Sequence, residues 1–458
     1  MRDCGPVPSQ RQLWASAGLN FVDRSAEDAC LLGAPLSQSS TDCTLTESLH
    51  QLERVKERLL KLSSHEAFFL LKSSLAIPKL QYLLRTAPCC HSPEAARLDE
   101  AIRDILSSVL NLKLDDAVWI QASLPVRWGG IGVRKVSTLA PSAFLASASA
   151  AESWIRRLLP GSLQLPPDEL VSEAAALWSD LAGMAVPFGQ DLTQRVLDDG
   201  ISDAISKKLL LQANPVNRAR LLASLAPGSG SWLQALPCSN LGLRLGNDEL
   251  RIAAGLRLGA PLVRAHRCVC GTEVEPNGHH GLACRRSAGR HRRHALANDV
   301  IVRAIRSTAV HAELEPPRLL RGDGKRPDGA TLDPWHSGRY LVWDFTCPDT
   351  LAPSHLSQSS LAAGAVAANA EVKKQTKYAE LVSSGDFLFA PIAVETLGVW
   401  GPSALSLCSA IGGRITNLTG DLRALSFLKQ RLGLAVQRGN AAAVVGTHPQ
   451  GDISASYA

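Results

Sequence analysis

Methionine and aromatic residues are scarce in this chain of 458 residues, which has two methionines and only 5% aromatic residues. Leucine and alanine recur throughout, and this balance favours helices over a sandwich or barrel built from β-branched and aromatic residues. With 45% hydrophobic and 20% charged residues, the chain can bury sizeable cores, in roughly two to four units. Extensive disorder is therefore excluded, and we expect a mainly helical protein.

Long apolar runs are also missing from the sequence. No stretch approaches the roughly 18 apolar residues that a membrane-spanning helix needs. Residues 1–6 lack the apolar core of a secretory signal. We therefore expect a soluble, intracellular protein that does not contact a membrane.

The eleven cysteines are an odd number, and eight of them are scattered without the regular spacing of a secreted disulfide framework. The other three, Cys268, Cys270 and Cys284, lie close to His279 and His280. Three thiolates and one imidazole form a tetrahedral ligand set of the kind that structural zinc prefers. The spacing predicts a zinc knuckle, with His280 as the fourth ligand and His279 as the alternative. Because only one residue separates the first two cysteines, buried thiols beside chance histidines are the competing interpretation.

The positive charge of the chain is concentrated around these cysteines. Residues 264–306 contain nine arginines and three acidic residues, a surplus of six that equals the net charge of the whole chain. Arginine recognises phosphate through a planar fork of donors, so the cluster predicts contact with nucleic acid rather than only a solvated surface. The predicted nucleic-acid-binding residues are Arg285, Arg286, Arg290, Arg292, Arg293 and His294.

Hydrophobic periodicity and turn residues predict six consecutive segments. They are an irregular N-terminal segment (1–43), a helical region (44–160), a helical connector (161–263), a zinc knuckle with a basic helix (264–306), an α/β core (307–400), and C-terminal helices with a tail (401–458).

Several boundaries rest on local signals. An amphipathic helix is predicted over 44–62, and residues 160–167 are interpreted as a linker. Asp198-Asp199-Gly200 is predicted to break a helix, and disorder is expected after Gly446. The glycine-rich segment 124–133 is interpreted as a tight turn, because no Lys-Ser/Thr pair follows it as in a phosphate-binding loop.

The α/β core is predicted from two short apolar runs, 341–346 and 387–394, with an Ala-rich helical stretch over 361–382 between them. The fold class is therefore mainly α with a C-terminal α/β domain.

Residues suited to phosphodiester hydrolysis lie in this core. Asp328 precedes the first run, Asp344 lies within it, and Lys374, Lys377 and Tyr378 lie on the following helix. Two carboxylates can hold Mg²⁺, and an amine can orient water and neutralise developing charge. Helical spacing places Lys374, Lys377 and Tyr378 on one face. The alternative interpretation, without a catalytic site, is that Asp328 opens a turn, Asp344 ends a strand and the lysines form a solvated helix face.

Two registers of the hairpin remain open from the sequence. A hairpin centred at His336 would place Asp328 directly opposite Asp344. A two-residue turn at 337–338 would instead place Asp344 opposite Thr331.

From Cys268 onward the chain resembles the C-terminal part of non-LTR retrotransposon proteins that carry a restriction-like endonuclease. The matching residues are Cys268, Cys270, His280, Cys284, Arg293-His294, Asn298-Asp299, Lys325-Arg326-Pro327-Asp328, Val342-Trp343-Asp344 and Lys374-Gln-Thr-Lys377-Tyr378. The resemblance implies a CCHC knuckle followed by a PD-(D/E)xK-type nuclease. It implies that Asp328 and Asp344 bind the metal and that Lys374 completes the site.

The N-terminal third resembles the thumb-like region that follows the palm of such a reverse transcriptase, chiefly over 68–85 and 124–133. A polymerase palm needs paired aspartates on a hairpin and another acid upstream, to hold two metal ions. Asp115-Asp116 and Asp198-Asp199 do not have this setting. We therefore expect the chain to begin after the polymerase centre and to lack reverse transcriptase activity by itself.

The first hypothesis is a Mg²⁺-dependent endonuclease with a structural Zn²⁺, which nicks target DNA to prime reverse transcription and also contacts element RNA. Such a role would require residence in the nucleus. The second is a catalytically inert module that binds nucleic acid through the knuckle and the basic helix. A helical scaffold without a nucleic-acid role is the third, and it leaves the clustered arginines unexplained.

Overall fold

The computed structural model describes residues 29–158, 168–187, 192–287, 289–317, 319 and 326–448. Part of the irregular start (1–28), the linker over 160–167, Lys325 and the tail from 449 lie outside the described residues. The structure is 60% helical with a small mixed sheet, which confirms the mainly helical class. Within the described ranges, no helix combines the length and the apolar character needed to cross a bilayer.

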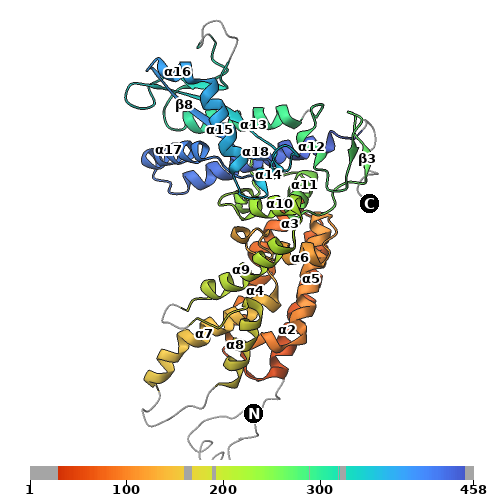
Figure 1. Ribbon diagram of the computed structural model, residues 1–458. Coiled ribbons are helices and arrows are strands. Elements are labelled where there is room, and N and C mark those ends of the chain that lie inside the picture. The colour runs from red at the N-terminus through yellow and green to blue at the C-terminus, as the bar shows by residue number, and fades with distance from the viewer. Residues whose placement is uncertain are drawn as a thin grey trace, which may run out of the picture. The chain divides into compact units, whose positions relative to one another are not determined.

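The chain forms two compact units that alternate along the sequence (Figure 1). Unit 1 contains the described residues up to Leu59, Lys72–Ile105 and Arg134–Ala204. Unit 2 contains Leu60–Leu71, Leu106–Val133 and the described residues from Ile205 onward. The units thus alternate, whereas the six predicted segments are consecutive, and the boundaries of those segments stay predictions.

Unit 1 is helical apart from one short hairpin. Its elements are β1 (Cys30–Leu31), β2 (Ala34–Pro35), α2 (Gln38–Leu59), α4 (Ile77–Thr86), the 3-10 helix η2 (Cys89–His91), most of α5 (Pro93–Leu110), α7 (Val136–Leu158), α8 (Glu169–Ala182) and the first half of α9 (Gln194–Gln212). Helix α2 buries Leu45, Leu52 and Leu59, as the predicted amphipathic pattern requires. It begins before residue 44 because the Ser37 side chain accepts the Ser40 N–H (3.0 Å).

The predicted helix break at 198–200 is wrong, because α9 continues through it. A Cβ atom at Gly200 would lie 2.9 Å from the buried ring of Trp178, so glycine is needed there for close packing. Asp198 is buried and accepts a hydrogen bond from Arg134 (2.6 Å). Asp198 and Gly200, which indicated a helix break, therefore serve pairing and close packing within a continuous helix.

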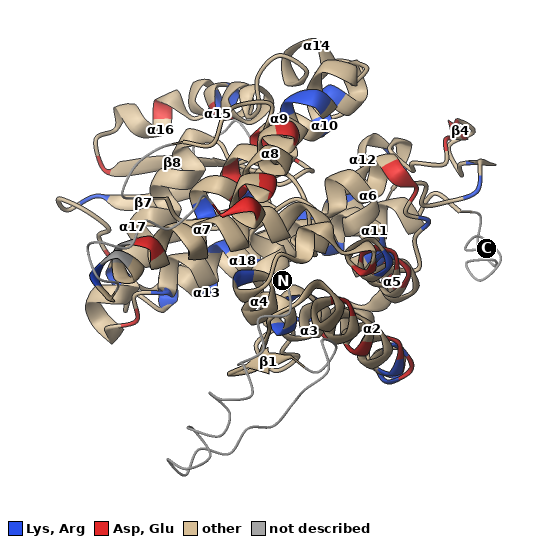
Figure 2. Ribbon diagram, turned by 90° about the horizontal axis from the view of Figure 1, so that it is seen from below, with Lys and Arg blue, Asp and Glu red and all other residues tan. Residues whose placement is uncertain are grey.

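Helix α8 carries acidic residues and no Lys or Arg (Figure 2), whereas the acidic residues of α9 are balanced by Arg195, Lys207 and Lys208. Helix α8 therefore offers no cation to a phosphate.

Unit 2 contains the remaining helices, the Cys/His segment and the larger sheet. Its helical elements include α3 (Ser64–Leu70), α6 (Asp116–Ala122), η3 (Val126–Trp128), α10 (Pro215–Leu225), η4 (Ser231–Gln234), α11 (Asn247–Leu258), α12 (His280–Ala283), α13 (Gly289–Arg306), α14 (Leu356–Ser359), α15 (Ala365–Lys377), α16 (Ala379–Ser383), α17 (Pro402–Thr419) and α18 (Ala424–Val445). A π-helical turn, η1 (Leu71–Leu75), follows α3, and all of it except Leu71 belongs to unit 1. Helix α18 is central, since α11, α12, α13, α17 and η4 all pack on it.

The glycine-rich turn over 124–133 is held by a buried arginine rather than by a phosphate. Arg257 donates hydrogen bonds to the carbonyl oxygens of Gly130 (2.9 Å), Val126 (3.0 Å) and Ser224 (3.0 Å). Burial lowers the pKa of Arg257 to about 9. A Cβ atom at Gly130 would lie 2.0 Å from the Leu124 carbonyl oxygen. Residues 124–133 therefore form a tight turn with a structural role, as the sequence indicates.

The larger sheet has four strands in the order β5-β6-β7-β8. Its strands are β5 (Ala312–Leu314), β6 (Gly329–Thr331), β7 (Tyr340–Thr346) and β8 (Phe387–Ala393). Neighbours pair antiparallel except β7 and β8, which are parallel and joined by α14, α15 and α16. The predicted strand–helix–strand unit is thus present. Its helical stretch is interrupted at Tyr378, between α15 and α16.

Alternation along β7 directs its side chains to two different layers. Leu341, Trp343 and Phe345 join a core with residues of α13, α17 and α18. Val342 instead packs with Tyr378 beside α15 and α16. Asp344 has the same parity as Val342, so its carboxylate faces the layer of α15.

Candidate functional site

The two predicted acids lie side by side on neighbouring strands. Gly329 pairs with Trp343 in the antiparallel ladder, and the Asp328 N–H donates to the Trp343 carbonyl oxygen (3.1 Å). The same register sets Asp328 opposite Asp344, on one face of the sheet. A Cβ atom at Gly329 would lie 2.0 Å from the Trp343 ring, so only glycine fits between the acid and its partner strand.

Each of the two registers that the sequence left open describes a different part of the hairpin. The strands β6 and β7 adopt the one centred at His336. The chain reverses at Ser337 and Gly338, whose φ angles are 50° and 76°, and His336 bridges to Arg339. Between the paired strands and the turn, the first arm of the hairpin has three residues more than the second, between Thr331 and His336. Both registers therefore occur in the same hairpin. A bulged arm therefore lets a tight turn coexist with the opposed aspartates.

Lys374 completes a compact charge cluster with Asp344. Helix α15 packs on β8, and the Nζ atom of Lys374 lies 2.7 Å from Oδ1 of Asp344. Lys377 Nζ is 3.9 Å from the other oxygen, Oδ2. Asp344 is only 3% exposed, so its charge has been removed from water and both lysines offset that cost.

Tyr378 supports this cluster from inside the protein. It is fully buried, and its hydroxyl donates to the Arg326 carbonyl oxygen (3.0 Å) and accepts a hydrogen bond from Lys377 (3.0 Å). Its ring packs against Phe389, with the ring centroids 4.7 Å apart. Tyr378 therefore fixes the backbone just before Asp328 and the direction of the Lys377 amine.

His294 contacts the acid pair, although the sequence assigns it to nucleic-acid binding. Its Nε2 atom lies 2.9 Å from Oδ2 of Asp328. The Trp343 indole N–H donates to Asn298 Oδ1 (3.1 Å), and the amide nitrogen of Asn298 lies 3.3 Å from His294 Nδ1. This series of hydrogen bonds leaves the His294 proton on Nε2, facing the carboxylate of Asp328. The hydrogen bond to Asp328 raises the pKa of His294, and partial burial opposes the shift.

The six predicted nucleic-acid-binding residues divide into different environments. Arg285, Arg286 and Arg290 are exposed. Arg292 is exposed but forms an ion pair with Glu249 of α11 (3.6 Å). Arg293 is only 2% exposed, so it is buried rather than part of the open surface.

Arg293 is buried because of its packing on α18. Its guanidinium donates to Asn440 Oδ1 (2.8 Å) and to the Leu282 carbonyl oxygen (3.0 Å). A Cβ atom at Gly439 would lie 1.7 Å from the Arg293 side chain, so a glycine on α18 makes room for it. Arg293 therefore stabilises the contact between α13 and α18, and it also lines the cleft described next.

A cleft of about 460 Å³ lies beside the acid pair and is lined by basic residues. Its lining includes Arg285, Arg290 and Arg293. It also includes His294, which contacts Asp328, and Lys374, which contacts Asp344. Thr346, two residues after Asp344, lies on the same wall. A phosphate in this cleft would meet the lining cations, two of which contact the acid pair.

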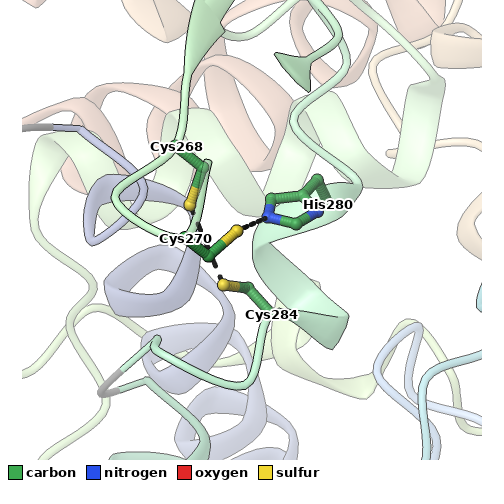
Figure 3. Close-up of side chains that lie close together, drawn as sticks. All are labelled: Cys268, Cys270, His280 and Cys284. Carbon is green, nitrogen blue, oxygen red and sulfur yellow. Dashed lines mark hydrogen bonds between the residues drawn. The ribbon is translucent and has the colours of Figure 1, made fainter. Parts of the chain in front are cut away.

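The four predicted zinc ligands converge on one point (Figure 3). Their ligand atoms all lie within 4.8 Å of one another, in a group that could hold a metal ion such as zinc. Cys268 Sγ and Cys284 Sγ are 3.8 Å apart, and Cys270 Sγ is 3.2 Å from His280 Nε2. Two sulfurs bound tetrahedrally at about 2.3 Å from zinc would be about 3.8 Å apart. The donor set and its spacing therefore suit zinc.

Local structure explains how two cysteines separated by one residue reach the same point. Cys268 and Cys270 lie on the turn between β3 (His266–Arg267) and β4 (Glu273–Val274), which Gly271 closes with a φ of 93°. Burial raises the pKa of the Cys268 thiol, whereas a hydrogen bond with Thr272 lowers the pKa of Cys270 to about 6.

His279 does not join the cluster. Its Nε2 atom is buried without a hydrogen-bond partner, and burial lowers the pKa of His279 to about 4. His280 is thus the histidine that the structure places beside the cysteines. Gly281 packs against α18, where a Cβ atom would lie 2.9 Å from the Ala443 carbonyl oxygen, so the segment carrying His280 is docked on the central helix.

Glu371 is a buried charged residue near the site that sequence patterns did not single out. One turn before Lys374 on α15, it accepts N–H groups from Ser403 (2.9 Å) and Ala404 (2.9 Å) at the start of α17. Burial raises its pKa. Glu371 therefore anchors α15 to α17 and helps to hold Lys374 in place. The signal in the sequence that could have identified Glu371 is its position three residues before Lys374, on the same face of the helix.

Comparison with known proteins gives one informative similarity. No family model matches the chain. Over 376 residues it is 23% identical to the "Retrotransposable element SLACS 132 kDa protein" of Trypanosoma brucei gambiense, a match that covers 80% of this chain. The match spans 27% of that protein, so the chain corresponds to about a quarter of the relative's length. This distant similarity supports a retrotransposon-related origin.

Proposed function

We propose that the chain is the metal-dependent DNA endonuclease portion of a retrotransposon-related protein. The observation that carries this proposal is the convergence of Asp328, Asp344 and Lys374 beside a cationic cleft that Lys374 lines. Carboxylate oxygens are the ligands that Mg²⁺ prefers, and the opposed pair supplies them from two neighbouring strands. A bound Mg²⁺ would polarise the phosphoryl oxygen and stabilise the charge that develops on it.

The residues of the chain would share the remaining work. Lys374 would orient the attacking water and neutralise negative charge, and Lys377 and Tyr378 would hold it in position. Arg285 and Arg290 would bind phosphates leading to the acid pair. In the element, such a nick in target DNA would prime reverse transcription, with element RNA as a further partner and the nucleus as the compartment.

A catalytically inert nucleic-acid-binding fragment is the second candidate. It is favoured by the fact that both carboxylates already have partners in the protein. Asp344 is ion-paired with Lys374, and Asp328 Oδ2 accepts the Phe345 N–H (2.6 Å) and contacts His294. A metal would have to compete with these groups. This candidate predicts salt-sensitive binding without cleavage.

A plasmid-nicking assay separates the two candidates. Supercoiled plasmid is incubated with the full chain in Mg²⁺ or EDTA, alongside Asp344→Asn. We expect nicking by the wild type in Mg²⁺ and a loss of about 100-fold or more in the variant, because one carboxylate ligand is removed. Asp386→Asn, in the exposed turn before β8, is the matched control.

Three outcomes are informative. Nicking by the wild type and by Asp386→Asn, but not by Asp344→Asn, supports the endonuclease. Equal nicking by Asp344→Asn would remove the acid pair from the mechanism. Binding of DNA without nicking under any divalent metal would establish the inert module.

A further inference from the structure

A second basic cavity lies in unit 2 apart from the cleft beside the acid pair. Its volume is about 540 Å³. The last turn of α5, the turn that follows it, helix α11 and the segment 261–264 form its walls. It shares no lining residue with the cleft beside the acid pair.

The lining of this cavity is strongly cationic. Lys113, Arg251 and Arg264 contribute three formal positive charges, and none of the lining residues is acidic. Ser107 and Ser108 also line the cavity, and the Ser107 hydroxyl donates to the Leu112 carbonyl oxygen. Ammonium, guanidinium and hydroxyl groups are the donors that proteins use to bind phosphate.

The geometry of the cavity is fixed by Arg251. This side chain is 8% exposed, and its Nε donates to the Asn111 carbonyl oxygen (2.9 Å). Asn111 has a φ of 49° and ends α5, where the Leu112 N–H donates to the Ser107 carbonyl oxygen (3.1 Å). A cation is thus held in a defined direction at the floor, while Lys113 and Arg264 are exposed at the rim.

We propose that this cavity binds the backbone phosphates of a nucleic-acid strand. No aromatic side chain lines it, so it offers no platform on which a base would stack. Contacts to phosphate carry no sequence information, so recognition here would be independent of sequence. The wall formed by 261–264 leads directly into β3, where the Leu262 N–H donates to the Pro276 carbonyl oxygen (2.7 Å). A strand held in the cavity would therefore lie beside the Cys/His segment.

The test removes the two exposed cations and leaves the structural arginine in place. The double variant Lys113→Gln/Arg264→Gln is compared with Lys207→Gln/Lys208→Gln, which loses the same charge from exposed positions on α9 outside the cavity. Binding of a labelled single-stranded oligonucleotide to the full, zinc-loaded chain is measured without added Mg²⁺ by fluorescence polarisation over a range of salt concentrations. DNA and RNA of the same sequence form the two arms.

We expect the slope of log affinity against log salt to fall by about 1.4 in the cavity variant, since each phosphate contact to a single strand contributes about 0.7. The same two contacts correspond to an affinity loss of about 25-fold at 0.1 M salt. The loss should be equal in the DNA and RNA arms, and the Lys207/Lys208 variant should keep the wild-type slope.

An unchanged slope in the cavity variant would overturn the proposal, as would an equal loss in the control variant. A loss confined to one arm would also overturn it, because backbone phosphates are common to both. The readout is independent of hydrolysis, since no Mg²⁺ is added. An inactive acid pair and a cavity that does not bind therefore give different results.

Discussion

Removing one sulfur from the Cys/His cluster should abolish tight zinc binding by this chain. The Cys284→Ser variant replaces a thiolate that lies 3.8 Å from Cys268 with a hydroxyl, which is a much poorer zinc ligand. The backbone at Cys284 is the C-cap of α12, and serine can adopt the same conformation. The substitution therefore tests the ligand and not the turn.

The size of the effect follows from the number of ligands. A structural zinc site is worth about 12 kcal/mol at neutral pH. Shared among four ligands, this gives about 3 kcal/mol for each, or an affinity loss of about 100-fold. Because α12 packs on α18, the loss should also lower the unfolding temperature of the zinc-loaded protein.

The assay is a chelator competition with a zinc-sensitive dye, together with the metal content of the purified chain. We expect one tightly bound zinc per chain in the wild type and in Cys238→Ser, whose thiol lies outside the cluster. His280→Ala should weaken binding, and His279→Ala should not. No bound zinc in the wild type, or full affinity in Cys284→Ser, would refute the assignment of these ligands.

Two further predictions concern the acid pair and its support. Gly329→Ala should destabilise the protein by about 1–3 kcal/mol, because its methyl group would overlap the buried Trp343 ring, whereas Gly413→Ala, in open space on α17, should stabilise it by about 0.5–1 kcal/mol. Urea unfolding of both variants checks this, and equal effects would contradict it. The raised pKa of His294 means that its contact with Asp328 stabilises the fold fully below about pH 6.5 and loses this effect as pH rises through the folded-state pKa. In metal-free buffer, the difference in unfolding free energy between wild type and His294→Gln should therefore shrink from pH 6 to pH 9, and a constant difference would be evidence against the contact.

The sequence by itself determined the elements whose signals are local. The leucine spacing in α2 requires one buried stripe, and the apolar runs at β7 and β8 match short buried strands. The zinc ligands could be named because all four lie within seventeen residues, so a short turn and one helical turn suffice to bring them together. Periodicity and ligand spacing are properties of neighbouring residues, and the sequence displays them directly.

The tertiary structure alone decided which groups share an environment over long separations. Arg293 and His294 are adjacent in a run of basic residues, yet one is buried against α18 and the other contacts Asp328. Gly200 is of a residue type that commonly breaks helices, but here it lies within a helix and allows close packing against Trp178. Burial and pairing depend on which distant element packs against a residue, and a linear charge pattern contains no information about that partner.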